Sequence, residues 1–238
     1  HLLESQCSHG DGQSAGVLMA VFTDNFDRAD EALEDGANWS ADSGAYDLVS
    51  NEVQVGSANA SIGTPLSAYA DSIPTQADMT VSCLVKKSTE QPGVGICVRR
   101  TSSGVFYFCE FGQVSNVFQL SRGVGSGSRV ILAEGTPIDP GTDDPTSYVT
   151  MTLTCVGSLL TATHSGWTLH AAESIQVIDT QITAAGYGGL SGWSASAPTH
   201  IAYFNNFELD DAVDPSPPAV VYVPPSFPGG AIFASPKS

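Results

Sequence analysis

The sequence predicts an all-β fold, built as a two-sheet antiparallel sandwich. Short runs of β-branched and aromatic residues recur along the chain, and Gly, Ser, Asn and Pro separate them, as in strands joined by turns. Sustained 3.6-residue periodicity is almost absent; residues 28–35 suit a short helix or a loop equally. Many short strands at even spacing indicate a sandwich or barrel, and 238 residues are enough for one such domain.

The strand pattern divides the chain into three parts. Residues 1–16 have the composition of an N-terminal arm or linker, residues 17–211 hold the sandwich, and residues 212–238 form a Pro-rich extended C-terminal strap. We expect strands near 17–23, 45–49, 52–56, 79–87, 94–100, 104–111, 116–121, 129–133, 147–155, 158–163, 174–178, 181–186 and 199–209.

The charge balance excludes two classes of partner. The chain has 25 acidic residues and 8 Lys plus Arg, a net charge of −17. Such a surface repels phosphate backbones and anionic lipids, so we expect no nucleic-acid partner and no membrane insertion. Solubility explains the acidity more simply. The apolar run at 15–22 is too short for a membrane span and lacks the basic flank of a signal peptide.

The strap carries apolar side chains between its Pro-Pro pairs. Proline removes backbone donors and favours a polyproline-like extended chain, so this segment does not form a central strand. Its apolar side would pack on its own domain or on a neighbouring subunit, as in extended-chain recognition. The candidate assembly residues are Val221, Tyr222, Val223, Phe227, Ile232 and Phe233.

Three cysteines fall in two expected hairpins. A turn centred on Ser103 places Cys97 opposite Cys109, and a turn near Glu90 places Cys83 opposite Cys97. A cross-strand disulfide between Cys97 and Cys109 is one interpretation, and small buried hydrophobic residues are the other. Zinc is disfavoured because the chain has no C-x-x-C spacing.

Catalytic patterns are weak. Glycoside hydrolysis needs two carboxyl groups about 5 to 9.5 Å apart, and a catalytic strand usually shows acids two or four residues apart. Glu208 and Asp210 have this spacing, but they lie where the domain ends, so a solvated edge is the favoured interpretation. The chain has no G-x-S-x-G elbow and no H-E-x-x-H motif. The sequence therefore assigns no catalytic residue.

Calcium is a candidate structural ion, although no cofactor is required. Asp24, Asp27 and Asp30 lie at one end of the first strand and Asp210 at the end of the last. Those two strands usually pair in such sandwiches, which would bring the oxygen ligands together. Asp24 is two residues from Phe22 and two from Phe26, so on an extended strand all three lie on one face. We expect the two rings on that face to point inward.

Sugar binding without hydrolysis needs aromatic platforms on a rim. Tyr187 and Trp193 in "GYGGLSGW", and Trp167 in its own turn, are the candidate glycan-binding residues. The alternative is that Tyr187 and Trp193 pack a loop over the core. Trp39 is expected inside the core.

Several motifs occur in an order that resembles concanavalin A-like (laminin-G/glucanase-type) jelly-roll domains. They are "FTDNFDRAD", Trp39 and Tyr46, "GICVRRTSSGVFYFCEF", "VTMTLTCVGSLLTAT", "DTQITAAGYGGL" and "AYFNNFELDD". The resemblance covers about 17–211 and implies a jelly-roll fold shared by lectins, glucanases and non-catalytic modules. The glucanase carboxylates are missing here. The opening "DNFDRAD" is similar to openings in bacteriophage and bacterial surface proteins.

Together these observations predict a non-enzymatic structural component of a virion or an extracellular assembly, held to neighbouring subunits by its terminal arms. The first alternative is a lectin-like carbohydrate-binding module that attaches to surface glycans. The second is a glycoside hydrolase with an atypical carboxylate pair. Each of them places the protein in a virion, outside the cell or at the cell surface.

Overall fold

The structure of the chain is a computed structural model, which describes residues 22–41, 46–55, 66–88, 93–112, 117–125, 128–137, 147–166, 171–193 and 201–211. Within these ranges nearly every element is a strand, and one 3-10 turn spans Leu33–Asp35. The expected arms at 1–16 and 212–238 lie outside them. No helix in this part of the chain is long and apolar enough to cross a bilayer.

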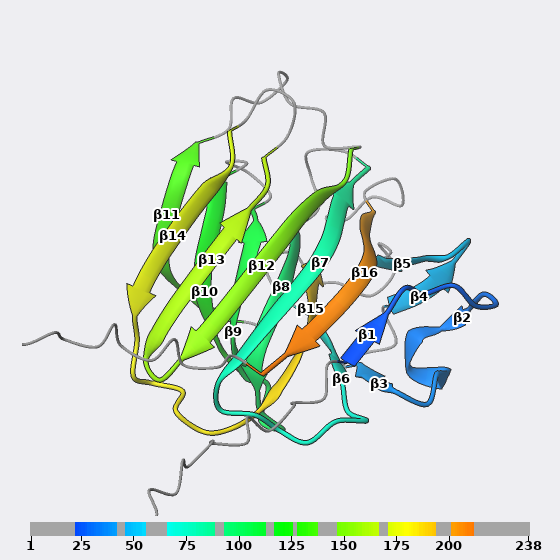
Figure 1. Cartoon of the computed structure of the whole chain (residues 1–238), viewed down its shortest axis with the longest axis horizontal. Coiled ribbons are helices and arrows are strands. Elements are labelled where there is room, and N and C mark those ends of the chain that lie inside the picture. The colour runs from blue at the N-terminus through cyan, green and yellow to red at the C-terminus, as the bar shows by residue number, and fades with distance from the viewer. Residues whose placement is uncertain are drawn as a thin grey trace, which may run out of the picture.

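The larger sheet has nine strands. They are β1 (Phe22–Asp24), β2 (Glu31–Ala32), β4 (Tyr46–Val49), β5 (Glu52–Val55), β7 (Met79–Lys87), β12 (Val149–Val156), β13 (Leu159–His164), β14 (Glu173–Ile178) and β16 (Ala202–Asp210). Their order is β14, β13, β12, β7, β16, β5, β4 and β2, and β1 pairs with β16 beside this path. The expected pairing of the first and last strands is therefore confirmed (Figure 1).

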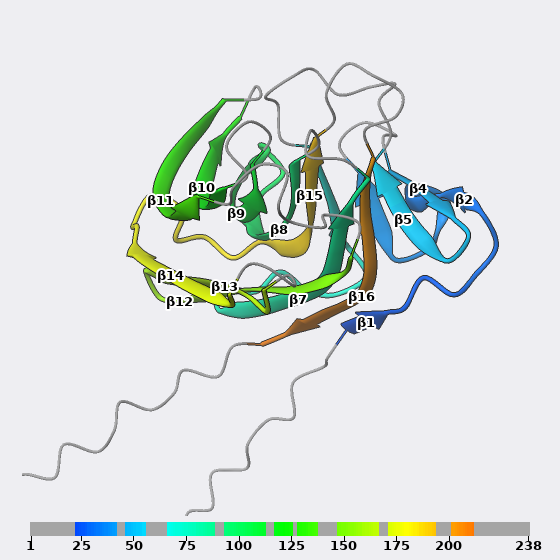
Figure 2. The ribbon, with the colours of Figure 1, turned by 90° about the horizontal axis from the view of Figure 1, so that it is seen from above.

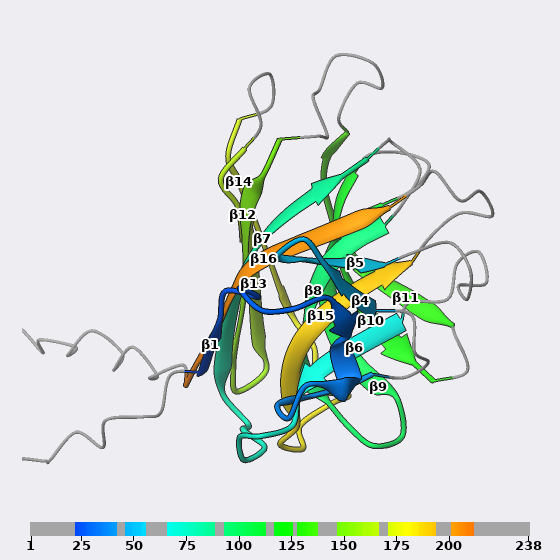
Figure 3. The same ribbon diagram turned by 90° about the vertical axis from the view of Figure 1, so that its right-hand side faces the viewer.

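The second sheet has seven strands. They are β3 (Trp39–Ala41), β6 (Leu66–Ala70), β8 (Gly93–Arg100), β9 (Val105–Phe111), β10 (Val117–Val124), β11 (Arg129–Pro137) and β15 (Tyr187–Trp193). Their order is β11, β10, β9, β8, β15, β6 and β3. Figures 2 and 3 show the two sheets as stacked layers, so the predicted two-sheet sandwich is confirmed.

The core lies between the layers and follows from period-two alternation. In β7, Met79, Val81, Cys83 and Val85 are fully buried, while the residues between them are half-buried on the outer face. Trp39, like Phe26, is buried as expected. Burying each large apolar side chain contributes roughly 1.5–3 kcal/mol, so this continuous core stabilises the fold without helices.

Most of the predicted strands are present within a few residues. The prediction at 181–186 is wrong, because side chains bind the backbone of Ile182 there. Its N–H donates to the Tyr107 hydroxyl (2.9 Å), and its carbonyl accepts from Arg99 (2.8 Å). The strand begins instead at Tyr187. Short strands β2, β3 and β6 were not predicted.

The predicted cysteine alignment is wrong for two reasons. First, β7 and β8 lie in different sheets, so Cys83 and Cys97 are not cross-strand partners. Second, the turn is centred on Ser103 as expected, with Thr101 N donating to Val105 O, but Arg99 at φ 52° forms a bulge. Cys97 therefore pairs with Phe108, and Cys109 with Ile96.

A one-residue shift moves a side chain to the opposite face of a sheet. Cys109 belongs to the core, whereas Cys97 packs with Phe106 and Phe108 on the outer face. The proposed Cys97–Cys109 disulfide is thus excluded, and both are free, buried thiols. The alternative interpretation, small buried hydrophobic residues, is the correct one.

Candidate functional site

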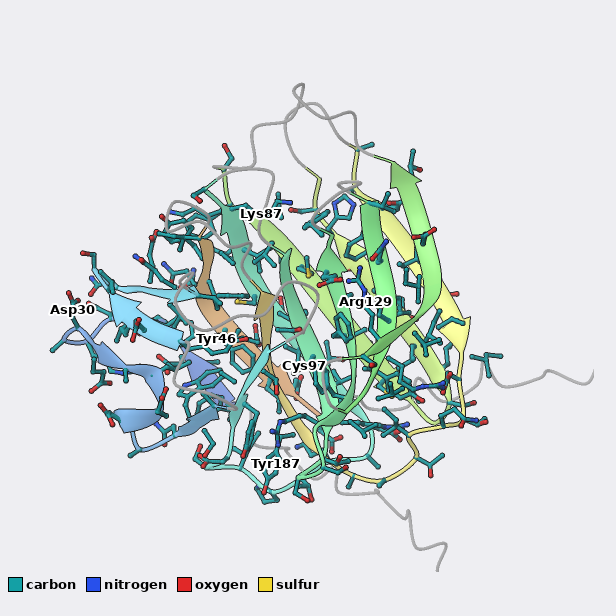
Figure 4. All side chains as sticks on the ribbon, turned by 180° about the vertical axis from the view of Figure 1, so that it is seen from behind. Asp30, Tyr46, Lys87, Cys97, Arg129 and Tyr187 are labelled. Carbon is teal, nitrogen blue, oxygen red and sulfur yellow. The ribbon has the colours of Figure 1, made fainter. Side chains whose placement is uncertain are left out.

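A row of polar residues crosses the outer face of the seven-stranded sheet, the face turned away from the other layer. Residues that pair across neighbouring strands share a face. The registers connect one residue from each of six strands, β6, β15, β8, β9, β10 and β11 in that order. This polar row is Ser67, Ser191, Gly95, Glu110, Gln119 and Glu134. Figure 4 views the molecule from the side of this sheet.

Most of the polar row is buried. Ser67, Glu110 and Ser191 are fully buried and Gln119 is 4% exposed, whereas Glu134 at the sheet edge is exposed. Buried polar atoms in proteins nearly always have hydrogen-bond partners. Here Gln119 Oε1 and Ser191 Oγ have none among the described residues, and neither has Ser121 Oγ in the next row. On this face, these three oxygens are the buried side-chain atoms that lack a hydrogen-bond partner among the described residues.

Two charge-assisted contacts hold the acidic half of the polar row. The Arg129 guanidinium donates to the Glu110 carboxylate, and Gln119 Nε2 donates to Glu134 Oε1 (2.7 Å). Gln119 therefore has its amide nitrogen bound and its oxygen unpartnered, which fixes which end of the amide is available. Hydrogen bonds to charged groups are the stronger kind, so the carboxylates are oriented rather than mobile.

Gly95 makes this close packing of β8 on β9 possible. A Cβ added there would lie 2.8 Å from Glu110 Cβ and would also overlap the Cys109 carbonyl oxygen. Only a residue without a side chain fits between Ser191 and Glu110. Gly95 thus lets β8 lie close against β9 at the centre of the polar row.

An apolar patch borders the polar row. Cys97, Phe106 and Phe108 form a small outer-face cluster, and the two rings lie 5.4 Å apart between centroids. Burial raises the pKa of the Cys97 thiol far above its ordinary value, so this sulfur is not a nucleophile. Buried apolar side chains therefore lie next to the hydrogen-bonding groups of the polar row.

The candidate glycan residue Tyr187 lies at one end of this face (Figure 4). Its ring is 5.1 Å from that of Tyr69, and the Arg100 guanidinium stacks 4.0 Å over Tyr69. Arg100 Nε also donates to Ser67 Oγ (2.9 Å), which connects the aromatic end to the polar row. Tyr187 and Tyr69 are half-buried.

The other two candidate glycan-binding residues are Trp193 and Trp167, and the structure describes the side chain of neither. Trp193 ends β15 at the register position opposite Gly93, and its side chain is outside the described part of the chain. Trp167 also lies outside the described residues. Sequence reasoning missed Glu110, Gln119 and Ser191, although a signal existed: each is a polar residue inside an otherwise apolar or Gly-rich strand.

The four aspartates proposed for calcium do not come together. Asp24 accepts hydrogen bonds from Arg28 Nη1 (2.8 Å) and Trp39 Nε1 (2.8 Å), so its carboxylate is already bound. Asp30 Oδ1 caps the Ser50 amide, Asp27 is exposed, and Asp210 pairs with Thr80 on β7. Across the described ranges no three His, Cys, Asp or Glu side chains form a metal site.

The outward-facing acids of β9 and β16 lie on different sheets. On β9 the outer-face residues are Phe106, Phe108 and Glu110, so this strand carries one acid there. Glu208 is exposed, and Asp210 lies on the same outer face of the other sheet. The exposure of Glu208 agrees with its interpretation as part of a solvated edge.

No protein-family model and no curated protein matches this chain. Solved structures do match it. Carbohydrate-binding module CBM66 from Bacillus subtilis is 13% identical over 73% of this chain and 96% of that one, with a TM-score of 0.56. The CBM2 module of the evolved Dit protein of Lactobacillus casei BL23 phage J-1 is 11% identical over 82% and 98%, with a TM-score of 0.52.

A prokaryotic β-1,3-1,4-glucanase (lichenase) derived from a mouse hindgut metagenome is 10% identical over 81% of this chain and 99% of that one, with a TM-score of 0.56. At such identities the likeness is one of fold. It confirms the concanavalin A-like jelly roll, a fold that binding modules and enzymes share.

Proposed function

We propose that this chain is a non-catalytic carbohydrate-binding domain whose ligand lies along the polar row. The observation that carries the proposal is the set of three buried, unpartnered oxygens, Gln119 Oε1, Ser121 Oγ and Ser191 Oγ. Each such atom costs about 1–3 kcal/mol of stability when it is unsatisfied. A ligand rich in hydroxyl groups would supply donors to all three once it displaced what covers them.

The rest of the face suits the same ligand. Sugars have apolar C–H faces as well as hydroxyls, and pockets for small ligands combine aromatic surface with a few placed polar groups. The half-buried rings of Tyr69 and Tyr187 supply the aromatic surface. At about 4.8 Å per strand, the six strands of the polar row span about 24 Å, which favours an oligosaccharide over one sugar ring.

Binding without hydrolysis is favoured by the way the acids are held. A glycosidase needs one carboxyl group to give up its proton and another to act as nucleophile or base. Glu110 already accepts from Arg129, and Glu134 from Gln119, so both acids are engaged in contacts within the protein. The solved carbohydrate-binding modules with this fold support the same choice.

The test is a glycan array followed by titration calorimetry on the best neutral oligosaccharide. Gln119→Ala and Ser191→Ala should each weaken binding about tenfold or more, because each removes a hydrogen bond worth about 1.4 kcal/mol. Gln176→Ala is the matched control, since Gln176 is exposed on the other sheet. An array without hits, or affinities that Gln119→Ala leaves unchanged, would refute the proposal.

An assembly role outside the cell or in a virion is the second candidate. The phage Dit module among the similar folds favours it, although the strap that would dock on a neighbouring subunit lies outside the described residues. Removal of residues 212–238 should then abolish association with neighbouring subunits and leave glycan binding intact. Sedimentation of the truncated and full-length chains tests this, and unchanged assembly would remove the candidate.

A further inference from the structure

A hollow of about 460 Å³ lies on the opposite side of the sandwich, on the nine-stranded sheet. Its lining residues are Glu52, Gln54, Lys86, Lys87, Ser88 and Tyr203. They come from the β5, β16 and β7 region, three strands that are neighbours in the sheet (Figure 3). The registers place Gln54 opposite Tyr203 and Tyr203 opposite Lys86, so these three share one face.

That face is the outer one. In β7 the buried residues alternate with half-buried ones, and Lys86 is among the latter; in β5 the same alternation leaves Glu52 and Gln54 half-buried while Val53 and Val55 enter the core. The hollow is therefore separated from the polar row by both sheets and the core between them. The two sites do not share a residue.

The charges on the outer face of the hollow neutralise each other, because Lys87, the second lysine of the lining, is buried and donates to the Gly112 carbonyl (3.5 Å). Lys86 Nζ lies 2.6 Å from Glu52 Oε1, and the Tyr148 hydroxyl donates to the same oxygen at 2.6 Å. The ammonium also lies 4.4 Å from the Tyr148 ring centroid and 4.7 Å from that of Tyr203. An anionic ligand would meet Glu52 and a cationic one Lys86, so neither charge is favoured.

Two polar groups remain for a ligand. Across the described residues, the Gln54 amide and the Tyr203 hydroxyl have no hydrogen-bond partner, and both side chains are half-buried beside the hollow. An amide and a phenol both donate and accept, as sugar hydroxyls do. The ring of Tyr203 adds an aromatic surface held in place by Lys86.

We infer that this hollow is a second saccharide site, which takes a neutral sugar unit at the end of a glycan. Its volume is near the lower end of small-ligand pockets, roughly 300–1,000 Å³, which suits one or two rings. With sites on opposite outer faces, one domain would contact two glycan chains or two parts of a branched one. Such bivalency raises avidity without any new contact.

Saturation-transfer NMR on the full chain tests the inference. The probes are methyl β-D-glucopyranoside, methyl β-D-galactopyranoside and methyl α-D-mannopyranoside, with methyl β-D-glucuronide as the acidic comparison. At least one neutral glycoside should give a signal that Gln54→Ala abolishes and Tyr203→Phe weakens. Tyr203→Phe removes only the hydroxyl, so the ring, the contact with Lys86 and the fold are kept.

The variants separate this inference from the proposed function. A signal that Gln54→Ala removes and Gln119→Ala preserves supports the second site, whatever the array shows for the polar row. A signal that survives both Gln54→Ala and Tyr203→Phe overturns the inference, and so does the absence of any neutral-sugar signal. Preference for the glucuronide would also overturn it, because the charge argument would then be wrong.

Discussion

Asp24 Oδ2 accepts a hydrogen bond of 2.8 Å from the indole nitrogen of Trp39. The same carboxylate binds Arg28 and caps the Phe26 amide, while the Trp39 ring packs 4.9 Å from Phe207 on β16. One acid thus joins β1, the following turn and the first strand of the second sheet. The aspartate that stood out among inward-facing aromatics is a structural anchor.

Asp24→Asn should destabilise the fold by about 1–3 kcal/mol, because it removes a charged acceptor from partly buried donors. Urea unfolding measures the change, with added calcium as a second condition. Asp27→Asn is the matched control: Asp27 is exposed, and we expect a change within about 0.5 kcal/mol. If calcium restored the stability of Asp24→Asn, the anchor role would be wrong.

Gly95→Ala should destabilise the chain by about 1–3 kcal/mol through overpacking, since the new methyl group would meet Glu110 and the Cys109 carbonyl. Glycan binding should weaken as well, because the strand that centres the polar row must shift. Gly112→Ala provides the comparison, as its nearest neighbour would be Gln119 Oε1 at 3.4 Å, an ordinary contact. Equal stabilities for the two variants would contradict this account.

Asp179 should make the free energy of unfolding depend on pH in the acidic range. Its carboxylate accepts from the Tyr107 hydroxyl (2.6 Å) and from Arg122 (2.5 Å). Partial burial raises the pKa of Asp179, but the hydrogen bonds from Tyr107, Gln181 and Arg122 outweigh it and lower the pKa overall. The pKa of Tyr107 is raised to about 12, mainly by burial, so its proton stays in place at ordinary pH.

Because the folded pKa of Asp179 lies below the unfolded value of about 3.9, its contribution is present above that pH and is lost as the pH falls through the folded pKa. Asp179→Asn should therefore destabilise the chain at neutral pH and cost progressively less in acid. Urea unfolding at a series of pH values checks this, with exposed Asp47→Asn as control. A penalty for Asp179→Asn that is independent of pH would argue against it.

The buried cysteines should be unreactive in the folded chain. Cys83, Cys97, Cys109 and Cys155 are free and buried, and burial raises the pKa of each thiol. In a Cys7→Ser variant, Ellman's reagent should react slowly in buffer and quickly after unfolding, since the thiolate is the reactive form. Rapid labelling of the folded variant, or a mass that shows a disulfide, would contradict the structure.

The sequence by itself determined most of the strands and which side chains share a face within one strand, because burial on one side of a sheet forces alternation with period two. That rule correctly predicted most strands and the alternation of buried and outer residues within them, as in β7. Local pattern is sufficient for such features since each depends on neighbours along the chain.

Tertiary structure alone decided which strands are neighbours and in what register. The bulge at Arg99 exists because its guanidinium reaches carbonyls of Ala77, Gly157 and Ile182, three segments far apart in sequence. That bulge moved Cys97 away from Cys109, and the sheet order brought Ser191 beside Gly95 and Glu110. Residues distant in the chain meet through long-range packing, which no local pattern of residues encodes.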